Sequence, residues 1–565
     1  LTKGLRFKAL GTFKNWSKSI NKYSAGWNKY LLGSYEQNED GSYSYTTNRV
    51  GNEVSTDLNS TNETAGDRRI YLEAMVDYNR TFGRHDVNAM LLYNQDELVN
   101  NVPGNNLINS LPKRKQGLAG RLSYAYDGKY MAEVNMGYNG SENFAKGHRW
   151  GFFPSIALGY NISEESFFEP LRKVITSMKL RGSWGLVGND QIGGERFIYM
   201  PTINLSGKGF TTGIDQNYGL SGPVYTRYEN NSITWEVGEK INLGIDLQLL
   251  NSLNIVVDIF RETRRDIFQK KGTIPTYLGT GNTDVFGNLA EMKNQGLDLS
   301  IDYNKAFSKD FYMNFKGTFT YAHNEITKYD EAPKYAFQSK VGQSANVSQG
   351  YLSNGLFLDE AEIDRYNQQM GSTLGAGDIK YLNVSNMHGY GDDIVDVDDW
   401  TWIGNPTVPE IVYGFGPSFK YKNWDFSFFF QGVAKTSLFM SGFHPFGDNS
   451  LRNVLQFVAN DRWSPTNQNV DAKYPRLTRK TSLNNTNPGN SGRTSDYWMR
   501  DGSFLKLKNM ELGYTFKRMR FYISGSNLLT FSKFDLWDPE QGGGSGLKYP
   551  TQRVFNVGFQ MTFNN

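Results

Sequence analysis

The last residues of the chain alternate strictly between apolar and polar side chains. The apolar set is Phe555, Val557, Phe559, Met561 and Phe563, and the set between them is Asn556, Gly558, Gln560 and Thr562. This period of two residues indicates a β-strand, because successive side chains of a strand point to opposite faces. A Phe-rich strand with one apolar and one polar face is typical of an outer-membrane β-barrel. Soluble antiparallel sheets alternate too, so the pattern has to recur before it decides the fold.

The alternation does recur, with tight turns between the segments. Residues 71–78 and 87–93 alternate on either side of one short turn, and residues 118–126 and 130–138 alternate on either side of Asp127-Gly128. An Asp-Gly pair between two such runs predicts a hairpin, because both central residues of a type I′ turn need a positive φ. Further tight turns are predicted near residues 251–253, 308–310, 422–423 and 517–519.

Long polar connections separate these hairpins. They cover residues 15–68, 96–116, 188–230, 269–290, 327–405 and 436–503. Because short turns alternate with long loops, all long loops fall at one end of the sheet, as in outer-membrane barrels. The pattern predicts about 16 strands, with the assignment weakest near residues 162–177 and 231–268. The alternative is a large soluble all-β protein, which would not sort its loops so consistently.

The amino-acid composition excludes several other classes of protein. Only 38% of the 565 residues are hydrophobic and the mean hydropathy is −0.56, without the apolar run of about 18 residues that a transmembrane helix needs. Aromatic residues reach 15% and there are 59 Gly, which suits strands and tight turns. The net charge of +3 comes from interspersed charges, so no nucleic-acid partner is predicted. The absence of Cys excludes disulfides and thiolate metal sites.

Several collinear motifs from about residue 70 to the C-terminus resemble one family, the SusC-like (RagA-like) TonB-dependent outer-membrane transporters of Bacteroidetes. The first motifs are 138–155 (YNGSENFAKGHRWGFFPS), 163–168 (SEESFF) and 178–189 (MKLRGSWGLVGN). The middle of the series is 233–236 (ITWE), 242–246 (NLGID) and 287–298 (GNLAEMKNQGLD). The series ends with 403–407 (IGNPT), 503–509 (SFLKLKN) and 525–531 (GSNLLTF).

The resemblance implies that residues 1–565 are one transmembrane β-barrel domain, the C-terminal portion of a 22-stranded barrel. On this interpretation the plug domain and the first strands are missing from this chain and precede Leu1. The resemblance also implies active import of glycan or peptide oligomers across the bacterial outer membrane, with the long loops extracellular. The implied partners are a SusD-like surface lipoprotein, the TonB–ExbB–ExbD complex acting through the plug, and outer-membrane lipid. Dimers of transporter–lid pairs are expected.

Two other functions stay open on the residues alone. Sixteen strands could close on themselves as a passive porin, or the chain could be a soluble carbohydrate-binding β-protein. An enzyme is not predicted, because the five His residues are scattered and none lies in an HExxH or GxSxG motif.

An acidic segment at residues 389–400 is the one candidate metal site. In the resembling family this loop often follows an EF-hand-like pattern, in which several oxygens converge on Ca²⁺. Asp392, Asp396 and Asp399 match its fifth, ninth and twelfth positions, whereas His388 and Tyr390 stand where the first and third ligands belong. The alternatives are therefore a structural Ca²⁺ held by the three Asp and a solvated acidic loop; no other cofactor is predicted.

The aromatic residues fall into two groups. Those predicted to face lipid are Tyr71, Tyr93, Tyr124, Tyr126, Tyr138, Phe516 and Phe559. Those in long loops are Trp400, Trp402, Phe443, Phe446, Trp463 and Trp498. The loop group is predicted either to contact substrate, because aromatic faces stack on sugar rings, or to pack within the loops or against a lid. Phe563 is predicted to serve barrel assembly, as terminal aromatics do in this class.

Overall fold

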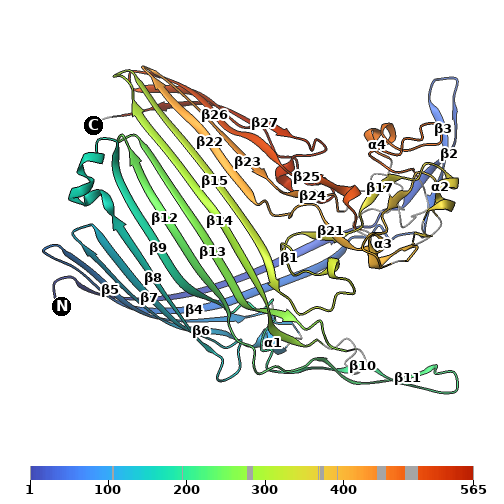
Figure 1. The fold of residues 1–565 in the computed structure, drawn as a ribbon. Helices are drawn as coiled ribbons and strands as arrows, with labels where there is room; N and C mark the ends of the chain where they lie inside the picture. The colour runs from blue at the N-terminus through green and yellow to red at the C-terminus, as the bar shows by residue number, and fades with distance from the viewer. Residues whose placement is uncertain are drawn as a thin grey trace.

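The architecture is a single large antiparallel sheet with long loops at one end (Figure 1). The structure is a computed structural model that describes residues 2–104, 107–193, 195–275, 284–366, 368–369, 374–390, 392–441, 454–477 and 494–563. Sixteen strands make the sheet, and each pairs with the next one in the order of the sheet. They are β1 (Leu5–Ser24), β4 (Asn59–Phe82), β5 (His85–Asn100), β6 (Lys113–Tyr126), β7 (Tyr130–Ser141), β8 (Trp150–Asn161), β9 (Ile175–Asn189), β12 (Glu236–Leu249), β13 (Leu253–Lys270), β14 (Phe286–Ala306), β15 (Phe311–Lys328), β22 (Ile411–Tyr421), β23 (Trp424–Ala434), β26 (Phe504–Phe516), β27 (Met519–Ser532) and β28 (Val554–Met561).

The predicted strand count and the sorting of the loops are confirmed. Within the described residues β1 pairs only with β4 and β28 only with β27, so the curled sheet is open along these two edges. The connections at one end are short, and the longest of them holds the 3₁₀ helices η1 (Ile162–Glu164) and η2 (Ser166–Leu171). Asp127 and Gly128 both have positive φ, 56° and 66°, as the hairpin prediction requires.

The long connections at the other end carry small elements of their own. The paired strands there are β2 (Lys29–Gln37) with β3 (Tyr43–Val50), β10 (Thr202–Thr212) with β11 (Tyr218–Arg227), β16 (Ser348–Gly350) with β21 (Thr401–Ile403), β17 (Ser353–Leu356) with β19 (Ile379–Tyr381), β18 (Gln368–Gln369) with β20 (Ile394–Val395), and β24 (Ser437–Phe439) with β25 (Met499–Asp501). The helices are α1 (Leu107–Ser110), α2 (Glu360–Arg365), α3 (Val384–Met387), α4 (Gln456–Asn460), η4 (Ala336–Gln338), η5 (Val397–Asp399), η6 (Asp496–Trp498) and η7 (Pro539–Gln541).

One predicted loop is largely strand. Residues 15–68 were expected to be a connection, but β1 and β4 stay paired as far as Ser24 and Asn59, and the β2–β3 hairpin follows. The outer half of this ribbon is mostly polar on both faces, with Trp16, Ile20 and Tyr23 too widely spaced to give the alternation that marks a strand in the sequence. Its strands are held by backbone pairing, which needs no apolar face.

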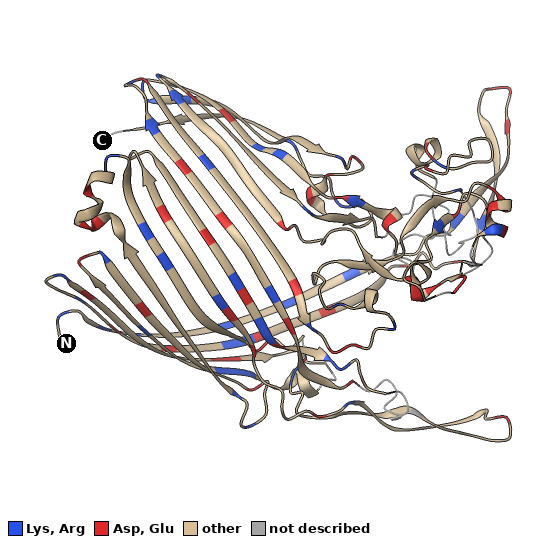
Figure 2. Cartoon of the chain, in the orientation of Figure 1, with Lys and Arg blue, Asp and Glu red and all other residues tan. Residues whose placement is uncertain are grey.

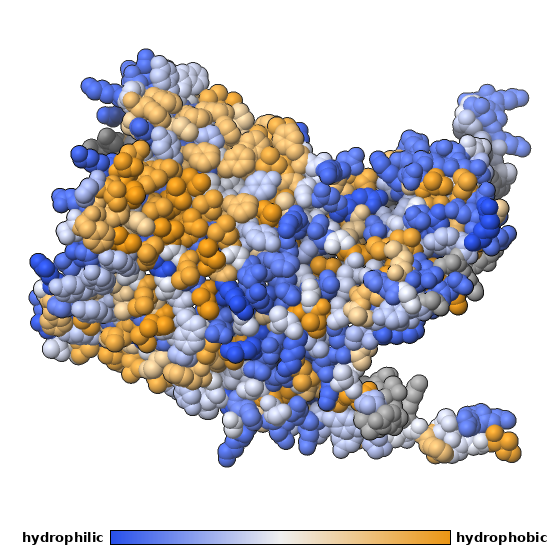
Figure 3. Space-filling view, viewed as in Figure 1, coloured by the Kyte–Doolittle hydropathy of each residue, from blue (hydrophilic) through white to orange (hydrophobic). Residues whose placement is uncertain are grey.

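The sheet has one apolar and one polar face along its whole width. On β13, Val257 pairs with Ile245 and Leu299, whereas its neighbour Val256 pairs with Asp246 and Ser300. The apolar side chains form the broad orange area over the strands in Figure 3. A hollow of about 610 Å³ is lined by residues of β4 to β12, with charged side chains such as Glu133 and Arg181 beside apolar ones such as Met131. The charged side chains that line this hollow lie on the polar face, so the polar face is the inner one.

Tyr71 is an exception to the predicted orientation of the strand aromatics. It was expected on the apolar face, but it pairs with Thr12 and Asp96 on the polar face. Its hydroxyl donates to Glu73 Oε2 at 2.7 Å. A tyrosine suits either face because its ring is apolar and its hydroxyl can find a partner, so its identity alone could not fix its side.

Candidate functional site

Ion pairs tie neighbouring strands together on the inner face. Arg181 on β9 reaches Asp246 on β12 at 2.8 Å and Asp258 on β13 at 3.0 Å. Gly244 lies between them, and a Cβ there would come within 2.6 Å of an Asp258 oxygen and 2.8 Å of the guanidinium. This glycine belongs to the 242–246 motif, so the structure gives the motif a physical reason: the backbone must leave room for the Arg181 side chain.

A second ion-pair cluster follows the same design on the opposite part of the sheet. Arg520 on β27 contacts Asp425 on β23 and Glu511 on β26. A Cβ on Gly513 would lie 2.6 Å from Arg520 Nη2 and from the Asp425 oxygens. Figure 2 shows such charges as blue and red bands that run across the strands. The inner wall therefore offers fixed, mutually paired charges around a hollow that solvent or a polar solute can fill.

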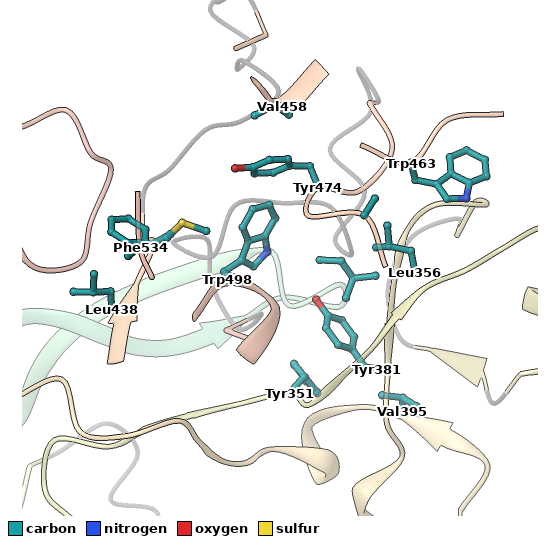
Figure 4. Close-up of a cluster of buried hydrophobic side chains, with 13 residues drawn as sticks. Tyr351, Leu356, Tyr381, Val395, Leu438, Val458, Trp463, Tyr474, Trp498 and Phe534 are labelled. Carbon is teal, nitrogen blue, oxygen red and sulfur yellow. The ribbon is translucent and has the colours of Figure 1, made fainter. Parts of the chain in front are cut away.

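Three long loops share one hydrophobic core, which we call the loop core. It consists of Tyr351, Leu356, Ile379, Tyr381, Val395, Leu438, Met440, Val458, Trp463, Ala472, Tyr474, Trp498 and Phe534. These residues come from the β15–β22, β23–β26 and β27–β28 connections. Figure 4 shows Trp498 in the middle of the group, with Tyr474 and Tyr381 on either side. The loops thus form one packed module above the sheet.

The predicted loop aromatics lie in different surroundings. Trp498 is fully buried and Trp463 is 5% exposed, both within the loop core, so their faces are covered by protein. Trp400 packs against this core, with its ring 5.9 Å from that of Tyr351. Trp402 is partly buried and donates from Nε1 to Ser339 O at 2.9 Å. Phe443 and Phe446 lie outside the described residues. Packing within the loops, one of the two predicted roles, is what Trp463 and Trp498 do here.

An exposed group of aromatic rings escaped the sequence analysis. Tyr335 lies 4.3 Å from Tyr390 and Phe337 lies 4.6 Å from His388, measured between ring centroids. Tyr390 is 50% exposed. The two pairs join segments about fifty positions apart in the sequence, and no local pattern links such segments.

Comparison with known proteins identifies the fold family. Residues 1–528 match the family model described as "TonB dependent receptor-like, beta-barrel". The chain belongs to this family. The β-barrel chain is 25% identical to TonB-dependent receptor P3 of Formosa agariphila, over 91% of its own length and 54% of that protein. It is 28% identical to TonB-dependent receptor SusC of Bacteroides thetaiotaomicron, over 79% of its own length and 43% of that protein.

Solved structures agree at the level of the fold. The RagAB peptide transporter superposes on all of the β-barrel chain and on 60% of the compared chain, with a TM-score of 0.71 and 19% identity. The chain spans about half the length of the curated relatives that it matches. Within the described residues, no helix is long and apolar enough to cross a membrane.

The acidic segment of this β-barrel chain closes through its own hydrogen bonds. Asp399 is fully buried; its Oδ1 accepts from the N–H and the hydroxyl of Ser385, and its Oδ2 accepts from the N–H of Asp396 at 2.8 Å. Asp392 Oδ1 lies 3.5 Å from the same Ser385 hydroxyl, and Asp396 caps η5. In the described part of the chain, no three His, Asp or Glu side chains are grouped to hold a metal ion. Calcium binding by the three Asp stays a prediction.

A buried lysine fastens the last long loop to the wall of the β-barrel. Lys506 on β26 is 0% exposed, and its ammonium lies 2.5 Å from Asp538 and 2.7 Å from Glu540 in the β27–β28 loop. Lys508 adds a second contact to Glu540 at 2.7 Å. Both lysines belong to the 503–509 motif. The loop that they hold also contributes Phe534 to the loop core.

Replacing Lys506 with Met is expected to release the β27–β28 loop, because Asp538 loses its lysine partner and Glu540 keeps only Lys508. Breaking a buried ion pair from one side costs about 3–5 kcal/mol, whereas Lys508→Met, which removes one more exposed contact, is the milder control. Hydrogen exchange of residues 533–553 measures the release. Equal protection in both variants would contradict this role for Lys506.

The same contacts make the loop sensitive to acid. Burial alone would raise the pKa of Asp538, but hydrogen bonds, foremost from Lys506, hold this pKa below its ordinary value of 3.8. The pKa of Glu540 is likewise held below 4.5, against the effect of burial, by Lys506 and Lys508. The two ionised carboxylates therefore stabilise the folded loop fully at a pH above their ordinary pKa values. This stabilisation is lost as the pH falls through their lowered pKa values in the folded protein.

Proposed function

We propose that this chain is the β-barrel of a SusC-like TonB-dependent importer in the bacterial outer membrane, with its long loops extracellular. It would take up oligomeric nutrients, glycans or peptides, together with a SusD-like lipoprotein at the loop face. The observation that carries the proposal is the one-sided sorting of the long loops, three of which share one hydrophobic core. Family membership and the likeness to SusC support it.

The proposed mechanism uses the wall and the loops differently. The loops would receive the oligomer beneath the lipoprotein lid. The charged inner wall would then provide a hydrated path for a polar oligomer. Energy would come from the TonB–ExbB–ExbD complex acting through a plug domain. The wall itself needs no nucleophile for this work, because import changes the position of the substrate and breaks no bond in it.

Uptake of labelled oligosaccharides and oligopeptides by intact cells tests the proposal. Uptake is expected to require this protein, TonB and the proposed SusD-like lipoprotein, and to stop when the proton gradient is collapsed. The purified protein is expected to give no steady conductance in a planar bilayer. Discrete conductance and uptake that continues without TonB would instead identify a passive porin.

The acidic segment carries a separate proposal, a structural Ca²⁺ at Asp392, Asp396 and Asp399. Because the segment already closes through Ser385 and Asp396, Ca²⁺ is expected to add to loop stability without being required for folding. Hydrogen exchange of residues 384–400 in Ca²⁺ and in EDTA measures the gain, and Asp396→Asn should abolish the difference. Identical hydrogen exchange in both buffers would contradict Ca²⁺ binding at this segment.

A further inference from the structure

A small basic pocket lies where the β9–β12 loop meets the rim of the sheet. It has a volume of about 80 Å³ and is bounded by Lys113, Arg114, Lys115, Ser141, Glu142, Asn143, Gln191, Ile192, Glu195 and Arg196. The rim here is fixed by a second hydrophobic cluster, in which Ile192, Ile198 and Trp235 pack against Phe144 and Phe153. The pocket is therefore built on a packed support.

Arg196 is the unusual member of this pocket. Two arginines of the described chain are almost wholly enclosed, Arg227 with 6% and Arg196 with 9% of their surface exposed. Arg227 contacts Glu195 at 2.7 Å, whereas Arg196 has no carboxylate within ion-pair distance among the described residues. Its terminal nitrogens donate to the carbonyl oxygens of Ile108, Leu111 and Pro112. Burial lowers the pKa of this guanidinium, and the negative charge of Glu142 opposes that shift.

One donor of Arg196 is left over. Arg196 Nε is buried and has no hydrogen-bond partner in the described structure. A buried donor without an acceptor costs about 1–3 kcal/mol, so native proteins usually satisfy such groups with a water or a ligand. The three carbonyl contacts fix the guanidinium against the α1 segment, and Arg196 Nε is left without an acceptor among the described residues.

The other basic side chains differ in how far they are already paired. Lys115 contacts Asp190 at 2.7 Å, and Arg114 contacts Glu97 at 2.7 Å. Lys113, in contrast, is exposed and has no carboxylate partner in the part of the chain that the structure describes. Four basic and two acidic side chains bound the pocket, and Glu195 is held by Arg227. Glu142, the other acidic side chain, lies 3.9 Å from Arg114, so Lys113 and Arg196 are the two cations at the pocket without a carboxylate in ion-pair contact among the described residues.

We propose that this pocket binds a single phosphate-sized oxyanion between Arg196 and Lys113. The pocket volume of about 80 Å³ leaves room for one tetrahedral anion. Ser141, Asn143 and Gln191 supply neutral polar groups around the anion. Guanidinium and ammonium groups together are a common means of holding phosphate. The anion can be free phosphate or the phosphate of a lipid headgroup that reaches the rim.

Calorimetric titration of the purified protein with inorganic phosphate, at low salt and in a phosphate-free detergent, tests the site. Low salt matters because ions screen exposed charges such as Lys113. Lys113→Ala is expected to weaken phosphate binding about tenfold, the order expected from losing one charge-assisted hydrogen bond. Lys146→Ala is the matched control: it removes the same charge from an exposed side chain of the β7–β8 loop that does not bound the pocket, and it should leave affinity within about twofold.

Arg196→Gln is the second variant, and it is expected to abolish phosphate binding. Because this change also removes contacts to the α1 segment, hydrogen exchange of residues 107–112 shows separately whether that segment loosens. Lys113→Ala carries the argument if Arg196→Gln fails to assemble. Binding that is equally strong in the wild type and in Lys113→Ala would overturn the proposal.

Lipid discs distinguish the two sources of the anion. One set contains lipopolysaccharide with its phosphates, and the other contains the enzymatically dephosphorylated form. If phosphate binding is blocked only in the discs with phosphorylated lipopolysaccharide, the lipid headgroup is the occupant. Equal phosphate binding in both sets identifies the free anion. Absence of phosphate binding in detergent and in both sets overturns the site.

Discussion

Replacing Trp498 with Ala is expected to unfold the loop core while the sixteen-stranded sheet stays assembled. Trp498 is fully buried at the centre of the cluster, and truncation of a core Trp typically costs about 3–5 kcal/mol. The sheet does not share this cost, because its strands are held by backbone pairing and by their own inner and outer faces. Limited proteolysis should therefore cut residues 454–477 and 533–553 much faster, with the barrel fragment left intact.

Two further variants make this result specific. Trp498→Phe keeps most of the apolar volume and loses no hydrogen bond, because Trp498 Nε1 has no partner within the described residues. It should behave almost like the wild type. Trp27→Ala, at a side chain that is 78% exposed, should change stability by no more than about 0.5 kcal/mol. If Trp498→Ala is cut as slowly as Trp27→Ala, the loop core does not hold the three loops together.

Replacing Val257 with Arg is expected to block assembly of the protein in the membrane, whereas Val256→Arg is tolerated. The two positions are adjacent on β13 and start from the same residue type. Val257 lies between Ile245 and Leu299 on the apolar face, where an Arg near the middle of a bilayer costs about 2–4 kcal/mol. Val256 lies beside Asp246 and Ser300 on the polar face, where an Arg side chain stays in a polar environment.

Unfolding by denaturant in lipid vesicles, together with the yield in outer membranes, measures both variants. The expected order of stability is wild type, Val256→Arg and then Val257→Arg. Equal loss in the two variants would mean that the apolar face of β13 does not meet lipid, and the soluble all-β alternative would return.

The alternation of side chains predicted the strands best where one face meets an apolar environment. The last strand follows the predicted pattern from Val554 to Met561, and the Asp127-Gly128 turn has the predicted backbone. Alternation no longer predicts a strand where neither face meets an apolar environment. The β1–β4 ribbon, for example, continues as far as Ser24 without an apolar face. Tyr71 shows a related limit: a residue that tolerates both environments carries no information about its side of the sheet.

The site residues were harder to predict because their neighbours lie far away in the sequence. The motif at 503–509 was recognised, but the reason for its lysines appears only when Asp538 and Glu540 are brought to the wall. Likewise, the burial of Trp498 depends on contributions from three loops. The pairing of Arg181 with Asp246 could be guessed from neither residue alone, because it follows from the register between β9 and β12.

The make-up of the loop core also fixes the order in which the molecule can fold. Its segments are separated along the chain by the hairpins β22–β23 and β26–β27, each of which must cross from one end of the sheet to the other and back. Phe534, the last contributor, follows β27, so the cluster cannot be completed before that strand exists. Closing contacts between segments so distant is slow. We therefore expect the loop core to consolidate only after the hairpins that separate its segments have formed.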